Sequence, residues 1–229
     1  MFGHLNPGGQ HFRDDHGAAD PRVAAALGAY QAAEGSEQAA LTALAAARLL
    51  VPVVAVLADG SAAGGDKNSE MMLPTLIGKD GRPAVLAFTS LDALARWRRS
   101  ARPVPAEAGR VWRAAVADRC AVVIDVAGPV SLAVEGARLE ALAAGQPVPP
   151  AHEDPDVRAK VEAAVAAEPA IAGFGLAPSH QADLAVRLQV TTGDWQPAVN
   201  RVGGGIAARL AGRLRRGIEI SVTRDPVVS

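Results

Sequence analysis

A proline-rich segment near residue 150 divides the 229-residue chain into two parts. Residues 146–151 read Gln-Pro-Val-Pro-Pro-Ala, a composition that excludes a regular helix or a central strand and is typical of a stiff linker. We therefore place the domain boundary here. The sequence predicts a flexible tail at residues 1–20, a first domain at 21–146, the linker at 147–154 and a second domain at 155–226.

The first domain contains a strand signal that is apolar on both faces. Residues 49–57 form this run, which predicts a central strand covered on both sides. An Asp80-Gly81 turn predicts that strands at 71–77 and 84–88 pair antiparallel. Further strands are predicted at 121–126 and 130–134. Helices are indicated by capping residues and apolar spacing, at 21–30, 36–48, 90–101 and around Val111, with a last helix ending at Gly145.

The second domain shows a shorter alternation of helix and strand. Asp154-Pro155 predicts the start of a helix, and strands follow at 171–177 and 184–190. Residues 195–214 have helical spacing of apolar side chains, and a last strand is predicted at 218–222. The predicted fold class is therefore α+β, with an N-terminal mixed β-sheet flanked by helices and a smaller C-terminal three-stranded α+β unit.

Composition and charge exclude some classes of partner. The formal net charge of -1 provides no general field for nucleic acid, and aromatic residues make up only 3% of the chain. The longest apolar run is about half the length that a bilayer requires, so we predict no membrane partner. A single cysteine, Cys120, cannot form an intrachain disulfide, and the sequence begins without a secretory signal, which indicates the cytoplasm.

Several predicted strands and turns are similar in sequence to those of a known family. The chain resembles the actinobacterial type of the SseB family, named for enhanced serine sensitivity, over roughly residues 20–145. The resemblance rests on residues 49–55, 66–71, 83–90 and 121–125, and on Gly128-Pro129. Residues 155–225 resemble, more loosely, the C-terminal domain of that family. Its biochemical activity is undefined, so the resemblance implies no functional residues.

Most candidate sites have a structural explanation that outweighs the functional one. His11, Asp15 and His16 could meet at one metal ion, but a solvated tail is the better interpretation, and we predict no metal. Cys120 is interpreted as a small buried hydrophobe rather than a nucleophile. His152 and His180 are interpreted as surface residues. The glycines at 203–205 lie inside a helical pattern, which indicates a softened helix or a close approach to the sheet rather than a phosphate loop.

Two basic runs are the remaining candidates. Both lie at predicted helix ends, where a solvated end is the alternative to an anion site. The second run is formed by Arg209, Arg213, Arg215 and Arg216. The first run is predicted to join a polar loop in a ligand or partner surface, which consists of Lys67, Ser69, Arg96, Arg98, Arg99 and Arg102. Arginine forks there could bind a carboxylate or phosphate.

No motif places a nucleophile, a base and an orienting group together, so we lean against an enzyme and predict no cofactor. The preferred function is a non-catalytic cytosolic binding or regulatory module whose partner is a protein or a small anionic ligand. The alternative is a sensor or enzyme acting on a small anionic metabolite linked to serine or amino-acid metabolism. Open edges of the C-terminal sheet leave oligomerisation as a further alternative.

Overall fold

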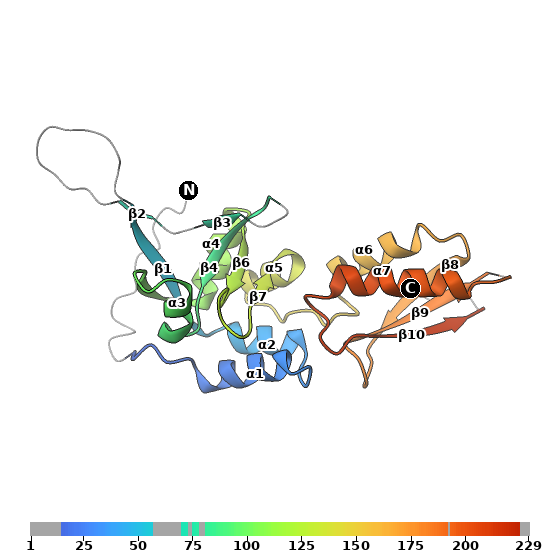
Figure 1. The fold of residues 1–229 in the computed structure, drawn as a ribbon, viewed down its shortest axis with the longest axis horizontal. Helices are drawn as coiled ribbons and strands as arrows, with labels where there is room; N and C mark the ends of the chain where they lie inside the picture. Colours follow the sequence, from blue (N-terminus) through green and yellow to red (C-terminus); the bar gives the residue numbers. More distant parts are fainter. Residues whose placement is uncertain (1–14, 57–69, 73–74, 78–80, 192, 225–229) are drawn as a thin grey trace, which may run out of the picture. The chain divides into compact units, whose positions relative to one another are not determined.

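A computed structural model describes residues 15–56, 70–72, 75–77, 81–191 and 193–224. The chain divides into two compact units (Figure 1). The first unit contains residues 1–25 and 43–146, and the second contains residues 26–42 and 147–229. The fold is α+β, as predicted, and a three-stranded sheet lies at the C-terminal end.

Two helices open the described part of the chain, α1 (Pro21–Gln31) and α2 (Glu37–Leu44). The Asp20 carboxylate accepts a hydrogen bond of 2.7 Å from a backbone N–H in the first turn of α1 and so caps this helix. The Ser36 hydroxyl accepts a similar bond of 3.2 Å at the start of α2. Both caps agree with the sequence prediction. Residues 26–42, which hold most of both helices, group with the second unit.

The first unit contains a three-stranded sheet in the order β2-β1-β5. Its strands are β1 (Arg48–Val56), β2 (Glu70–Met72) and β5 (Arg102–Glu107). β1 is central, as predicted, and pairs antiparallel with both neighbours. β5 was not predicted from the sequence, in which Pro103 and Pro105 disfavour a strand. Both prolines lie on an edge strand, where a missing N–H donor is tolerated.

A second sheet of the first unit has four strands in the order β3-β4-β6-β7. Its strands are β3 (Thr75–Ile77), β4 (Pro83–Ala87), β6 (Ala121–Ile124) and β7 (Leu132–Val134). β4 and β6 run parallel, and the two outer pairs are antiparallel, so the sheet is mixed as predicted. An antiparallel bridge also joins Leu50 in β1 to Phe88, the residue that follows β4.

Three further helices belong to the first unit. They are α3 (Leu91–Trp97), α4 (Ala108–Ala117) and α5 (Gly136–Ala144). α4 buries Trp112 completely. α5 ends at Gly145, which has a φ of +68°, a left-handed conformation that glycine adopts without strain. The predicted end of this helix is therefore confirmed.

Residues 15–18 contact β1 and α3. The Asp15 carboxylate pairs with the Arg48 guanidinium at 2.7 Å, and Arg48 also donates to the carbonyl of Ala18. The backbone N–H of Leu91 donates to the carbonyl of Gly17 at 2.8 Å. These residues form the C-terminal end of the segment predicted as a tail, and residues 1–14 lie outside the described part of the chain.

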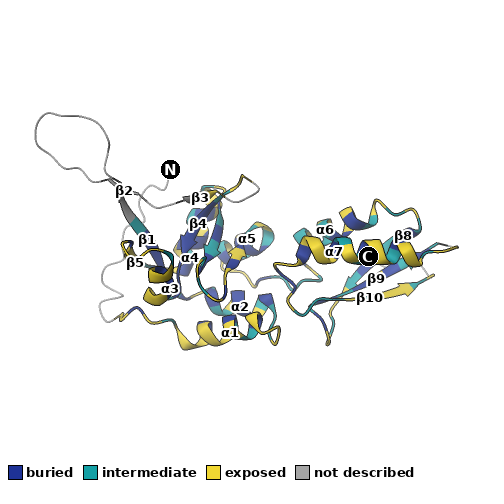
Figure 2. Ribbon diagram, viewed as in Figure 1, coloured by how far each residue is buried: buried dark blue, intermediate teal, exposed yellow. Residues whose placement is uncertain are grey.

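The second unit contains one sheet in the order β10-β9-β8, covered on one face by two helices (Figure 1). Its elements are α6 (Pro155–Val165), β8 (Ile171–Ala177), β9 (Leu184–Val190), α7 (Gln196–Leu210) and β10 (Ile218–Thr223). β8 pairs with β9 antiparallel, and β10 pairs with β9 parallel. Alternate residues of β9 are buried (Figure 2), which places Leu184, Val186 and Leu188 in the core beneath the helices.

The glycines at 203–205 lie inside α7. A Cβ atom at Gly203 would lie 2.9 Å from the Cδ1 atom of Ile220 on β10, whereas a Cβ atom at Gly204 would meet nothing within 4 Å. At Gly205 a Cβ atom would lie 3.6 Å from the Cβ atom of Ala164 on α6. The predicted close approach of this helix to the sheet is therefore confirmed at Gly203.

Gly204→Ala is expected to raise the free energy of unfolding by about 0.5–1 kcal/mol, because alanine loses less backbone entropy in a helix. Gly203→Ala should gain less, because its methyl group displaces the Ile220 side chain. Ile220→Val removes the displaced Cδ1 atom, so the two alanine variants should become equal in that background. Urea unfolding measures all the variants. Equal gains with Ile220 intact would contradict the close approach.

Candidate functional site

The predicted arginine site lies at the C-terminal end of α3. The Ser90 hydroxyl accepts a hydrogen bond of 3.1 Å from the backbone N–H of Ala93 and caps the helix, as predicted. Ala93 and Leu94 are buried in an apolar cluster that contains Phe88. Arg98 ends the helix in an extended conformation, and its N–H donates to the carbonyl of Leu94 at 2.9 Å. The buried side of α3 therefore fixes where the arginines begin.

Arg98 stacks on an aromatic pair. Its guanidinium carbon lies 5.1 Å from the centroid of the Trp97 ring, within the range of a cation–π contact. The Trp97 ring in turn lies 5.6 Å from the ring of Phe88, which is fully buried. This stack restrains the orientation of the Arg98 fork while the residue stays exposed.

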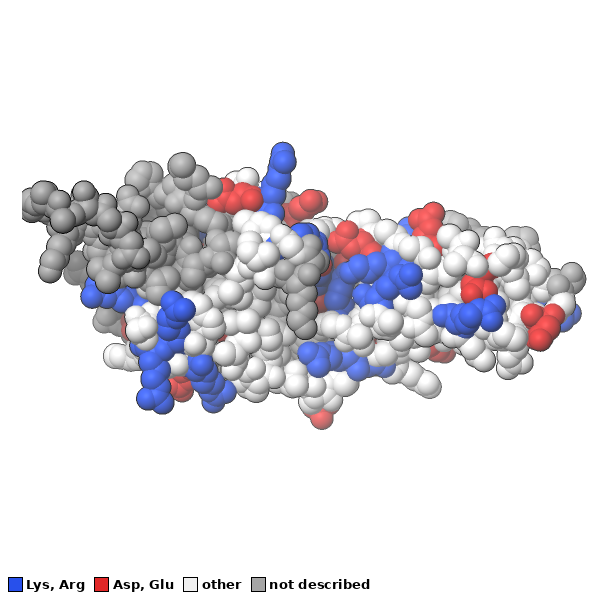
Figure 3. All heavy atoms as spheres, turned by 45° about the horizontal axis from the view of Figure 1, so that its top comes forward, with Lys and Arg blue, Asp and Glu red and all other residues white. Residues whose placement is uncertain are grey.

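All four described arginines of the predicted site are exposed. We call them the arginine surface, and they are Arg96, Arg98, Arg99 and Arg102. Ala101 is buried and anchors the segment between the last two. Most of α3 is exposed (Figure 2), and Figure 3 shows basic side chains projecting from the first unit with few acidic side chains between them.

The arginine surface is not neutralised by the carboxylates that the structure describes. Among the described residues, none of its four guanidinium groups takes part in an ion pair. Asp92 lies on the same helix, but it forms no ion pair with them. Lys67 and Ser69, which were predicted to join the site, lie outside the described residues.

A buried carboxylate supports the start of α3. Asp125 follows β6 and accepts hydrogen bonds from the backbone N–H of Thr89 at 2.8 Å and from the Thr89 hydroxyl at 2.6 Å. Burial raises the pKa of Asp125, and this effect exceeds the opposite effect of the Thr89 hydrogen bonds. The pair joins the ends of the parallel strands β4 and β6, directly before the helix that carries the arginines. The Thr89–Asp125 pair therefore fixes the position of the start of α3, the helix that carries the arginines.

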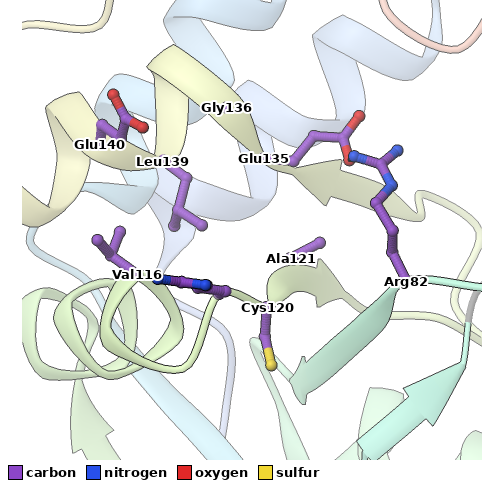
Figure 4. Close-up of a pocket in the computed structure, with 9 residues that line it drawn as sticks. Arg82, Val116, Cys120, Ala121, Glu135, Gly136, Leu139 and Glu140 are labelled. Atoms are coloured by element: carbon purple, nitrogen blue, oxygen red, sulfur yellow. The ribbon is translucent and has the colours of Figure 1, made fainter.

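A pocket of about 250 Å³ lies between α4, α5 and β6 (Figure 4). Cys120 lines it and is 8% exposed, so its predicted burial is confirmed. Burial, followed by the charge of Asp118, raises the pKa of the Cys120 thiol. The Sγ atom points away from Leu139 and Glu135 in Figure 4. A thiol that stays protonated is a poor nucleophile.

The second basic run is built into the fold of the second unit. Arg213 is 8% exposed, and its guanidinium contacts the carboxylates of Glu37 at 3.1 Å and Asp154 at 2.7 Å. The carbonyl of Arg213 also accepts a hydrogen bond from the hydroxyl of Tyr30. The prediction of a solvated helix end or an anion site is therefore wrong for Arg213. Two buried carboxylates occupy the fork that an anion would use.

The other residues of the second run are also engaged within the second unit. Arg209 donates to the carbonyl of Gly205 at 3.0 Å, and the Arg215 guanidinium lies 5.3 Å from the Tyr30 ring. The backbone N–H of Arg216 donates to Asp183 at 2.8 Å. These contacts leave the arginine surface of the first unit as the better candidate for an anion.

The histidines that the structure describes do not form an acid–base site. His180 is exposed, and His152 lies 3.4 Å from the carboxylate of Glu153. Asp15, one of the three possible metal ligands near the N-terminus, pairs with Arg48 instead, and His11 lies outside the described residues.

Sequence reasoning missed Arg119, which lines the pocket. Arg119 has a φ of +53° and is one of three described non-glycine residues with positive φ. Its position directly after a predicted helix is a signal for such a conformation, although glycine is the residue usually found there. Asp125, another of the three, follows an apolar strand, and a polar residue at that position is a signal for a strand-end site.

Comparison with known proteins identifies one matching family. The family model described as the SseB protein N-terminal domain matches residues 23–141. Neither the curated proteins nor the solved structures gave a match. In the described part of the chain, each helix falls short of the length and apolar character needed to cross a membrane.

Proposed function

This chain belongs to the SseB family, and we propose that it is a non-catalytic binding or regulatory module of the cytoplasm. The arginine surface is the proposed point of recognition, and the proposed partner is a protein that presents carboxylates or phosphates. The observation that carries this proposal is the exposure of four arginines that form no ion pair with a described residue. The single buried cysteine supports a reducing compartment.

The geometry supports an extended anionic partner more than a single small ion. The arginines occupy the last turn of α3, the connection that follows and the first residue of β5. Guanidinium groups bind carboxylates and phosphates through paired N–H donors, and the Arg98 fork is already oriented by Trp97. One exposed ion pair contributes about 0–1 kcal/mol, so several must act together to give useful affinity.

Electrostatic attraction would also set the rate of association. A local group of like charges raises the encounter rate with an oppositely charged partner, and salt weakens this effect. The net charge of -1 for the whole chain means that such attraction is confined to this surface. Binding should therefore weaken steeply as ionic strength rises.

Replacing Lys67, Arg98 and Arg99 together with alanine is expected to remove specific partners from pull-downs out of a cytosolic extract. Affinity for an isolated partner should fall at least about tenfold, because two or more charge-assisted contacts are lost. The control replaces Arg22, Arg110 and Arg113, which are exposed arginines of the same unit, and gives the same change in charge. Identical pull-down profiles for both folded variants would contradict the proposal.

A further inference from the structure

Arg119 occupies a backbone position that favours glycine. It follows α4 with a φ of +53°, and its N–H donates to the carbonyl of Val116 at 3.1 Å. The N–H of Cys120 donates to the carbonyl of Ala115 at 2.9 Å. This pair of bonds is the usual left-handed helix end, where a side chain is a conformational cost that glycine avoids. The backbone conformation at residue 119 would therefore be more stable with glycine than with arginine.

Arg119 is also one of four charged residues that line the pocket between α4 and α5. Two of them are already paired, since Arg82 and Glu135 lie 2.8 Å apart and point toward each other in Figure 4. The other two are Arg119 and Glu140, neither of which forms an ion pair within the described residues. Two arginines and two glutamates give the pocket a formal charge of zero, so it has no general attraction for an anion.

An apolar surface completes the pocket. Val116 is 39% exposed, and it is one of few large apolar residues in the described chain that are so exposed. Leu139 lies on the α5 side and is 4% exposed. An alkyl group placed against these two side chains would be removed from water, which is favourable.

We propose that this pocket binds a small zwitterion, specifically a free amino acid with a short aliphatic side chain. The Arg119 fork would take its carboxylate, Glu140 its ammonium group, and Val116 and Leu139 its alkyl group. A volume of about 250 Å³ suits a ligand of this size and is too small for a folded partner. The pocket is separate from the arginine surface, so either site can fail its test while the other stands.

The test uses three related probes with the full chain. L-valine carries both charges, N-acetyl-L-valine lacks the ammonium group, and L-valinamide lacks the carboxylate. We expect L-valine alone to raise the melting temperature by several degrees when present at about one hundred times its dissociation constant. Isothermal titration should show one site for L-valine and no binding of the blocked probes.

Arg119→Gly separates binding from stability. Without ligand this variant should melt about 2–4 °C higher than the wild type, because glycine relieves the left-handed conformation. It should nevertheless lose the response to L-valine. A purely structural role for Arg119 would not move these two quantities in opposite directions. Glu140→Gln should lose the response with little change in stability, and Arg110→Ala should keep it.

Two results would overturn the proposal. One is the absence of any response to L-valine, L-alanine or glycine at about 10 mM, a concentration that detects millimolar affinity. The other is an equal response to the blocked probes or to Arg119→Gly, which would show that the charges of a zwitterion are not what the pocket recognises.

Discussion

Replacing Arg213 with alanine is expected to lower the free energy of unfolding of the second unit by about 3–5 kcal/mol. Glu37 is 7% exposed and Asp154 is fully buried, and both carboxylates face the Arg213 guanidinium. Burial by itself lowers the pKa of Arg213, but these two carboxylates outweigh burial and raise it. The guanidinium therefore stays charged, and removing it leaves two buried negative charges without their cation.

Two further variants separate the ion pairs from simple loss of side-chain volume. The double variant Arg213→Met, Glu37→Leu should have a free energy of unfolding at least about 1 kcal/mol higher than that of Arg213→Ala. The reason is that only one buried carboxylate then lacks its cation. Asp154 still accepts hydrogen bonds from the backbone N–H groups of Asp156 and Val157. Arg209→Ala, which removes an exposed arginine in the last turn of α7, should change stability by about 0.5 kcal/mol or less.

Hydrogen exchange of the β9 amides measures this prediction for the second unit alone, and urea unfolding measures it for the whole chain. A loss for Arg213→Ala no larger than the loss for Arg209→Ala would contradict the role of the buried ion pairs.

The second large effect is expected at Asp125. Asp125→Ala should lower the free energy of unfolding by about 2–4 kcal/mol, because the buried N–H of Thr89 loses its acceptor. Alanine also lacks the polar side chain that helps a residue adopt the φ of +49° found here. Asp125→Asn keeps an acceptor for the N–H of Thr89 and tolerates this φ, so it should stay within about 1 kcal/mol of the wild type. Equal losses for both variants would contradict this account.

The pH dependence of Asp125 has a definite sign. Its pKa in the folded protein is raised by burial above the ordinary value of about 3.9. A carboxyl group with a raised folded pKa contributes stability that is complete below the unfolded pKa and is lost as pH rises through the folded pKa. The wild type should therefore gain stability relative to Asp125→Asn as pH falls from 7 toward about 4. Thermal unfolding of both chains across this range measures the difference, and a constant difference would contradict the raised pKa.

Local signals in the sequence predicted much of the fold. The start of α3, the end of α5 and the start of α6 follow from the capping residues Ser90, Gly145 and Asp154, because a cap depends only on neighbouring backbone groups. The predicted end of α3 near residue 101 is wrong, because this helix ends at Trp97. β1 was predicted as central because its residues are apolar on both faces. These features are properties of short segments, so sequence alone is sufficient for them.

Features that depend on distant partners were missed. The carboxylates that bury Arg213 lie 176 and 59 residues away in the sequence, and no local pattern separates a buried arginine from a solvated one. β5 is stabilised by pairing with β1, which overrides the unfavourable effect of its prolines. The run at 71–77 was predicted as one strand but contains β2 and β3, which pair with different strands.

The candidate site was predicted in part. The arginine run and its place at a helix end follow from the sequence, and its exposure is visible in the structure. The stack of Arg98 on Trp97 and the Thr89–Asp125 support were not predicted, because each depends on how β4, β6 and α3 meet. Convergence of Lys67 and Ser69 with the arginines stays a prediction.

The most direct test of the proposed function is an NMR titration of the labelled chain with a hexaglutamate peptide at low ionic strength. We expect shifts centred on the amides of residues 96–102 and on the Trp97 indole, because the Arg98 fork lies against that ring. The shifts should disappear in the Lys67, Arg98 and Arg99 alanine variant and persist in the Arg22, Arg110 and Arg113 control. Shifts spread equally over both groups of arginines, or no shifts at about 10 mM peptide, would contradict recognition by the arginine surface.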